Sequence, residues 1–170
     1  DDAKPIPETC LFRVASVEGV AWAKPLYKGI IQARLQNGTF QTCNLIGIDN
    51  TTLIGAPARM LQGKIEDLRR ADGIIVNEEG ALDKLANPPL YPGGPKVPLK
   101  VGQELELNNH RTVVVGIAET TRAFQSQPVI FTTYSNATLY APPQINLLSF
   151  ILVKAKSGEN LKALCERIKR

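Results

Sequence analysis

Histidine is nearly absent from this sequence, and its absence excludes much of enzyme chemistry. His110 is the only histidine in 170 residues, so no two histidines can share a metal ion, and a Ser/His/Asp triad would depend on this single ring. The preceding residues, Asn108 and Asn109, are typical of a hairpin turn and predict an exposed His110. A hydrolase that uses Ser126 or Ser149 with a remote acid is therefore the last of the functions we consider.

Cysteine is also scarce. Cys10, Cys43 and Cys165 lie far apart, without the CxxC or Cys/His spacing of a zinc site, so we expect no bound metal. Cys10 and Cys165 each lie on the apolar face of a predicted helix, which favours buried, reduced cysteines that pack as small hydrophobic residues. The alternative is one disulfide plus a leftover thiol, which requires an oxidising compartment.

Motifs for nucleotides and for membrane spans are lacking. The glycines form neither a Walker A nor a GxGxxG pattern, so we expect no cofactor and no ATP hydrolysis by this chain. The longest nearly unbroken apolar stretch, residues 145–153, is about half of the roughly 20 residues that cross a bilayer as a helix. The sequence begins at Asp1 without an initiator methionine or a leader, which predicts an excised fragment or a processed form.

Charge of one sign does not dominate the sequence. The formal net charge is +4, with 44% hydrophobic and 21% charged residues, which are proportions of a folded globular protein. The basic residues are scattered apart from the pair Arg69 and Arg70 and the tail RIKR. We therefore predict no nucleic-acid partner.

The first seventy residues predict a helix, a hairpin and short helical pieces. Apolar residues at helical spacing predict a helix within 5–19, and alternation predicts a strand over 20–35 that is interrupted near Pro25 and Gly29. The dipeptide Asn37-Gly38 fits a two-residue hairpin turn into a partner strand at 40–48. Short helical pieces are expected within 49–68.

The rest of the chain alternates strands with helices and two notable loops. Strands are predicted at 73–77, 103–107, 111–118 and 128–134, and helices at 78–86 and 157–170. The run 146–155 is apolar on both faces, as in a central strand. The loop 87–98 contains five prolines and two glycines, and loops of that length are often functional.

Several of these segments together resemble a known family. The stretch GIIVNEEGALDKL, followed by VGQELELNNHRTVVVGIA, is similar to the extracytoplasmic domain of the MacB/FtsX-like permeases of ABC transporters. VEGVAWAKPLY resembles the segment after the first helix of that family, and GIDNTTLIG resembles the crossing into its inserted lobe. FTTYSNATLYAPP is similar to the DevC-related subgroup.

The resemblance implies an α+β fold of two lobes on the periplasmic face of the bacterial inner membrane. Residues 1–49 and 119–170 would form a discontinuous porter-like lobe of βαβ sheet and helices, and residues 50–118 an inserted, smaller α/β lobe of the sabre type. The family normally has a strand before its first helix, whereas only DDAK precedes it here. An unpaired sheet edge would favour a homodimer.

The resemblance also implies a non-catalytic function. The domain would pass motion of transmembrane segments, powered by a cytoplasmic ATPase, to a periplasmic membrane-fusion adaptor or a substrate carrier. The alternative is a free-standing periplasmic module that binds a lipid or a peptide in a cleft between the lobes.

Candidate partner-binding residues lie in two loops. The polar loop ETTRAFQSQ supplies Arg122, Phe124, Gln125 and Gln127, and the proline-rich loop supplies Tyr91. Arginine and aromatic side chains are the types that anchor protein interfaces. The alternative for the polar loop is a simple crossover with Phe124 packed in the core.

Overall fold

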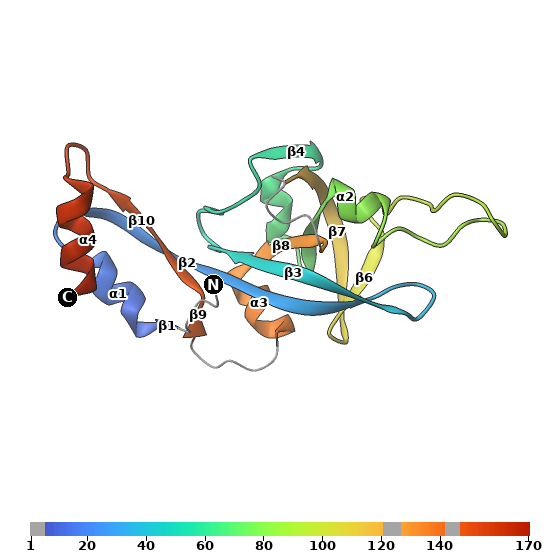
Figure 1. Ribbon diagram of the computed structural model, residues 1–170, viewed down its shortest axis with the longest axis horizontal. Coiled ribbons are helices and arrows are strands. Elements are labelled where there is room, and N and C mark those ends of the chain that lie inside the picture. The colour runs from blue at the N-terminus through green and yellow to red at the C-terminus, as the bar shows by residue number, and fades with distance from the viewer. Residues whose placement is uncertain (1–5, 121–126, 142–146) are drawn as a thin grey trace.

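The structure is a computed structural model that describes residues 6–120, 127–141 and 147–170. In chain order its elements are β1 (Ile6–Pro7), α1 (Thr9–Ala15), β2 (Val20–Arg34), β3 (Phe40–Ile48), β4 (Arg59–Gln62), the 3-10 helix η1 (Ile65–Arg69), β5 (Gly73–Asn77), α2 (Glu78–Leu82), β6 (Glu104–Leu107), β7 (His110–Glu119), β8 (Val129–Thr133), α3 (Tyr134–Tyr140), β9 (Leu147–Leu148), β10 (Phe150–Ala155) and α4 (Leu161–Lys169). Figure 1 shows two parts. We call residues 9–26 and 150–170 the stem, and residues 27–120 and 127–141 the body.

The strands of the body form a ring of pairings. β2 pairs with β3, β3 with β8, β8 with β5, β5 with β7, and β7 with β6. β6 then returns to β2 through the pairs Ala33–Leu107 and Arg34–Glu106, which closes the ring. β4 pairs with the end of β7, on the edge opposite β5. The β3–β8 and β5–β7 pairs are parallel and the others antiparallel, so the sheet is mixed. This sheet, with its few helices, confirms the predicted α+β class.

β2 is one continuous strand that belongs to both parts of the molecule. Residues 20–26 pair with β10, and residues 27–34 pair with β3. The predicted interruption near Pro25 and Gly29 is therefore wrong. In β2 and at Leu35, which follows it, the backbone N–H groups of odd-numbered residues face β3. The N–H of Leu35, for example, donates a hydrogen bond to the carbonyl of Thr39. The β3 ladder begins only at Tyr27, so the missing N–H of Pro25 costs no hydrogen bond between strands.

Two hydrophobic clusters lie in the body, on opposite faces of its sheet. The first contains Ile31, Leu45 and Ile130 and is covered by α2 and α3, whose Tyr140 is completely buried. The second contains Ile48, Ile75 and Phe131 and is covered by η1 and the chain between β3 and β4, which supplies Leu53. Alternate residues of β3, β5 and β8 enter different clusters because neighbouring strand side chains point to opposite faces.

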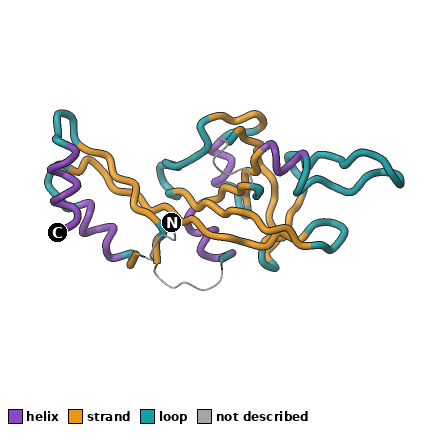
Figure 2. Tube along the Cα trace, in the orientation of Figure 1, coloured by secondary structure: helices purple, strands orange, loops and turns teal. Residues whose placement is uncertain are grey.

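The stem is a two-stranded ribbon with two helices at its far end (Figures 1 and 2). Three apolar side chains of the stem, Val20, Pro25 and Leu164, are buried, and none of them belongs to a cluster of the body. β10 was expected to be a central strand, and this is wrong, because it pairs with the half of β2 that has left the body. Phe150 and Val153 of β10 are 40% and 36% exposed as a result.

Three other expectations need correction. Residues 59–62 form strand β4 instead of a helical piece, because they pair with β7. The turn between β2 and β3 is longer than two residues. The N–H of Leu35 donates to the carbonyl of Thr39, and the N–H of Gly38 donates to the carbonyl of Leu35. Within this turn, only Gly38 has a left-handed backbone. A strand does precede α1, since β1 pairs with β9.

The division into lobes at residues 49/50 and 118/119 stays a prediction. Strands from both expected lobes pair in the ring: β3 and β8 come from the first, and β5, β6 and β7 from the second. The homodimer likewise stays a prediction.

Candidate partner-binding site

The predicted polar loop is only partly described. Arg122, Phe124 and Gln125 lie outside the described residues. Gln127 is half-buried, and its Oε1 accepts a hydrogen bond of 3.0 Å from Nε2 of Gln41 on β3. The bond holds the start of β8 beside β3, so Gln127 has a structural contact in addition to any contact with a partner.

The proline-rich loop, residues 87–98, projects from the body, and its two arms run alongside each other (Figures 1 and 2). Its base is clamped by two backbone hydrogen bonds between Asn87 and Val97, of 2.7 and 3.0 Å. An ion pair of 2.6 Å between Lys96 and Asp83 attaches it to the residue that follows α2. Five prolines and this clamp limit the conformations of the loop, so little entropy is lost when a partner binds it.

The tip of the loop presents apolar side chains. Leu90 is 87% exposed and Tyr91 is 61% exposed. The ring of Tyr91 lies against Gly94, where a Cβ atom would come within 2.9 Å of the ring. The N–H of Gly94 also donates a hydrogen bond of 3.0 Å to the carbonyl of Tyr91, which fixes the turn. Tyr91 is thus an oriented side chain on an exposed tip.

α2 lies beside Gln127, the last residue of the polar loop. Asp83, which binds Lys96 at the base of the proline-rich loop, also lines a hollow of about 310 Å³ together with Glu79, Lys84 and Gln127. The structure therefore brings Gln127 and Asp83, which binds the base of the proline-rich loop, to one hollow beside α2. Tyr91 lies farther out, at the tip.

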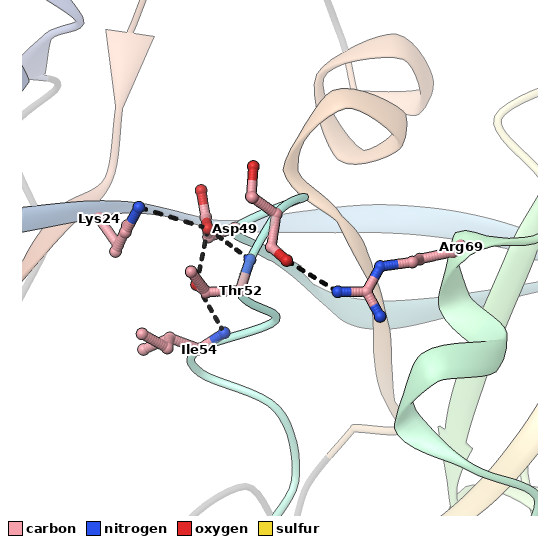
Figure 3. Close-up of polar contacts among 6 residues, drawn as sticks. Lys24, Asp49, Thr52, Ile54 and Arg69 are labelled. Carbon is pink, nitrogen blue, oxygen red and sulfur yellow. Dashed lines mark hydrogen bonds and ion pairs between the residues drawn. The ribbon is translucent and has the colours of Figure 1, made fainter.

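A polar junction that the sequence patterns did not single out connects the stem to the body (Figure 3). Oδ2 of Asp49 accepts hydrogen bonds from the backbone N–H and the hydroxyl of Thr52, of 2.9 and 2.6 Å, and lies 3.9 Å from Nζ of Lys24 in the stem. Burial by itself raises the pKa of the Asp49 carboxyl, but the hydrogen bonds from Thr52 and the charge of Lys24 hold that pKa below its ordinary value.

The turn after Asp49 is held from two further sides. Arg69 on η1 donates a hydrogen bond of 2.7 Å to the carbonyl of Thr51. Oδ1 of Asn50 accepts a bond of 3.1 Å from the N–H of Ser135 on α3, and its amide bonds to the Ser135 hydroxyl. The signal available in the sequence was the spacing Asp49-x-x-Thr52, which is typical of a side-chain-stabilised turn.

The residues considered for hydrolysis have other contacts. The hydroxyl of Ser149 accepts a bond from the N–H of Lys28 and donates one to its carbonyl, both of 2.9 Å. His110 is the first residue of β7, and its ring lies 5.4 Å from that of Tyr140. Ser126 lies outside the described residues. Over the described part of the chain, no group of three or more metal-binding side chains converges.

No helix among the described residues has the length and apolar composition needed to cross a membrane. All three cysteines are free thiols: Cys43 is buried, Cys10 half-buried and Cys165 exposed. The expectation that Cys165 is buried is wrong, because α4 buries only its Leu164.

Comparisons with known proteins agree with the architecture. The fold is similar to the periplasmic region of MacB from Actinobacillus actinomycetemcomitans, with a TM-score of 0.66, 15% identity, and coverage of 96% of this chain and 71% of that chain. It is also similar to the extracellular domain of the ABC-type transporter YknZ from Gram-positive bacteria, with a TM-score of 0.62, 12% identity, and coverage of 94% and 78%. No curated protein sequence matches. Residues 2–170 match the MacB-like periplasmic core domain, and the chain belongs to that family.

Proposed function

We propose that this chain passes the motion of transmembrane segments to a periplasmic adaptor or substrate carrier, without catalysis of its own. Its family makes it a periplasmic domain of an ABC-type transporter permease. The observation that carries the proposal is the family match over residues 2–170. A separate cytoplasmic ATPase would supply the energy. Such a role needs stiff elements and a binding surface rather than groups with catalytic geometry.

β2 is the element best suited to transmit motion. Its fifteen residues run from the stem into the body, and both halves are paired with other strands. The junction around Asp49 braces the point where the strand changes partners, because it ties Lys24 of the stem to the turn after β3. A displacement of the stem would therefore move the body as a unit.

The docking surface would combine the two candidate loops. The exposed tip at Leu90 and Tyr91 supports the proline-rich loop, because large exposed apolar side chains on a restrained loop favour binding. The second loop of the proposed docking surface is the polar loop, whose partner-binding residues would be Arg122, Phe124, Gln125 and Gln127. The two-lobe division at residues 50 and 118 and the DevC-related subgroup are parts of it as well.

A capture experiment tests the proposal. The membrane-fusion adaptor encoded beside the permease gene is immobilised, and the 170-residue chain is passed over it. We expect binding by the native chain, and weakening of about tenfold or more for Tyr91→Ser and for the pair Arg122→Ala and Phe124→Ala, as for interface anchors. Phe12→Ser, which removes an exposed aromatic ring from the stem, is the matched control. Failure of the native chain to bind would refute adaptor coupling.

One observation favours the alternative of a lipid- or peptide-binding module. A hollow of about 490 Å³ lies between β4, α2 and residues 98–101, and Leu61, Leu82, Val101 and Ile117 are among its lining residues. Apolar hollows of this size accept small ligands. Binding of a fluorescent fatty acid that is abolished by Leu82→Asp would support this alternative.

A further inference from the structure

The positive charge of this chain is concentrated in one segment. Residues 150–170 contain six basic and two acidic residues, a net charge of +4 that equals the formal charge of the whole chain. The other 149 residues contain fourteen basic and fourteen acidic residues and are neutral overall. The segment forms β10 and α4, so the stem is basic and the body is not.

Both acidic residues of this segment are already paired within it. Glu159 binds Arg167, and Glu166 lies 3.2 Å from Lys169. Across the described ranges, no salt bridge engages Lys154, Lys156 or Lys162, all of which are exposed. The positive field of the stem is therefore directed to solvent.

Exposed apolar side chains accompany this charge. Phe12 on α1 is 78% exposed and Leu161 on α4 is 65% exposed. Leu161 also lines a shallow hollow with Lys162, Cys165 and Lys169. Figure 1 shows α1 and α4 together at the far end of the ribbon, away from the proline-rich loop. Charge and apolar surface thus coincide at one end of the molecule.

We propose that the stem binds the surface of a bilayer that contains anionic phospholipids. The lysine side chains would contact the lipid phosphates, and Leu161 and Phe12 would enter the headgroup region. Amphipathic helices with basic polar faces bind such surfaces through buried apolar area plus electrostatic attraction. A second copy of the stem fits less well, because two segments of +4 repel each other. Permease membership places a bilayer close to this domain.

Sedimentation with lipid vesicles tests the proposal, with the 170-residue chain and no adaptor present. We expect binding to vesicles of phosphatidylcholine mixed with phosphatidylglycerol, weak binding to phosphatidylcholine alone, and loss of binding as salt rises. The double variant Lys156→Gln and Lys162→Gln should weaken binding about 30-fold, because each basic residue near an anionic surface contributes about a factor of five. The control, Lys64→Gln with Lys100→Gln, removes the same charge from the body and should bind like the native chain.

A second pair of variants separates apolar insertion from charge. Leu161→Ser should weaken binding roughly tenfold, whereas Leu90→Ser, which changes an even more exposed leucine on the proline-rich loop, should have no effect. Circular dichroism confirms that each variant is folded. Equal binding to neutral vesicles, or equal losses for the stem and body variants, would overturn the proposal. Because no adaptor is present, the result is independent of the proposed coupling.

Discussion

The hydroxyl of Tyr134 donates a hydrogen bond of 2.6 Å to Oε1 of Glu8. Tyr134 is the first residue of α3 in the body, and Glu8 directly precedes α1 in the stem. The two residues are 126 positions apart, so the bond fixes α1 to the body at a point that the β-ladders do not reach. Burial, followed by the bond and the charge of Glu8, raises the pKa of Tyr134.

Removal of this hydroxyl should loosen the stem. We expect Tyr134→Phe to lower the free energy of unfolding by about 1 kcal/mol, because a hydrogen bond to a charged group is lost while the ring remains. Urea denaturation measures the change. Tyr91→Phe, which removes a hydroxyl from the exposed loop tip, is the control and should leave the midpoint unchanged. Equal midpoints for the native chain and Tyr134→Phe would contradict the prediction.

The protein should lose stability in alkaline solution. Burial raises the pKa of the Cys43 thiol to about 12, and burial together with the charge of Asp72 raises the pKa of Tyr140 to about 12. In the unfolded chain these groups lose their protons near 9.0 and 10.0. The unfolded state therefore binds fewer protons in this window, and the free energy of unfolding falls as pH rises.

Thermal unfolding at a series of pH values checks this decline. The melting temperature should be level near neutral pH and fall from about pH 9 upward. A Tyr140→Phe variant should show a shallower decline, because one of the raised groups is gone. A melting temperature that stays constant to about pH 11 would contradict the prediction that these two buried groups keep their protons in the folded state.

Asp49 should produce the opposite dependence at acid pH. Its folded pKa is lowered, so its contribution is present above the ordinary value of 3.8 and is lost as pH falls toward the folded value. We expect Asp49→Asn to reduce the free energy of unfolding by about 1 kcal/mol at neutral pH, and by less in acid. Glu66→Gln, on the exposed side of η1, is the control. A variant equally destabilised at both pH values would point to a packing defect instead.

The three cysteines should differ in reactivity. Cys165 is exposed, Cys10 half-buried and Cys43 completely buried. An aromatic disulfide reagent should therefore modify Cys165 first and Cys43 only after denaturation, because the thiolate is the reactive form and the buried thiol stays protonated. Mass spectrometry of the labelled peptides gives the order. Modification of Cys43 in the native chain at a rate similar to that of Cys165 would be inconsistent with the structure.

Local signals in the sequence were sufficient for some elements of the body. Asn108 and Asn109 predicted a tight turn, and both have the left-handed backbone, with φ of 47° and 65°, that such turns require. The apolar run 73–77 predicted a buried strand, and every residue of β5 is buried. In these segments the local preference and the tertiary contacts agree.

Nonlocal pairing explains the failures. β10 is apolar enough for a central strand, but its position depends on where β2 leaves the body, which no pattern within 146–155 reveals. The role of Gln127 in partner binding stays a prediction, but its contact with Gln41, 86 positions away, could not be found from the loop sequence. Asp49 and Thr52 formed a recognisable local turn, whereas the contact with Lys24 required the folded chain.

The change of partner strands along β2 also sets the boundary between two units that can unfold separately. Among the described residues of the stem, only Leu26 packs against a cluster of the body, and it is half-buried. Residues 20–26 and β10 can therefore open while the ring from Tyr27 onward stays intact, as a separate unit of partial unfolding. Backbone amides of a single strand would then exchange with solvent at two different rates, and the step between them would fall between Leu26 and Tyr27 rather than in any loop.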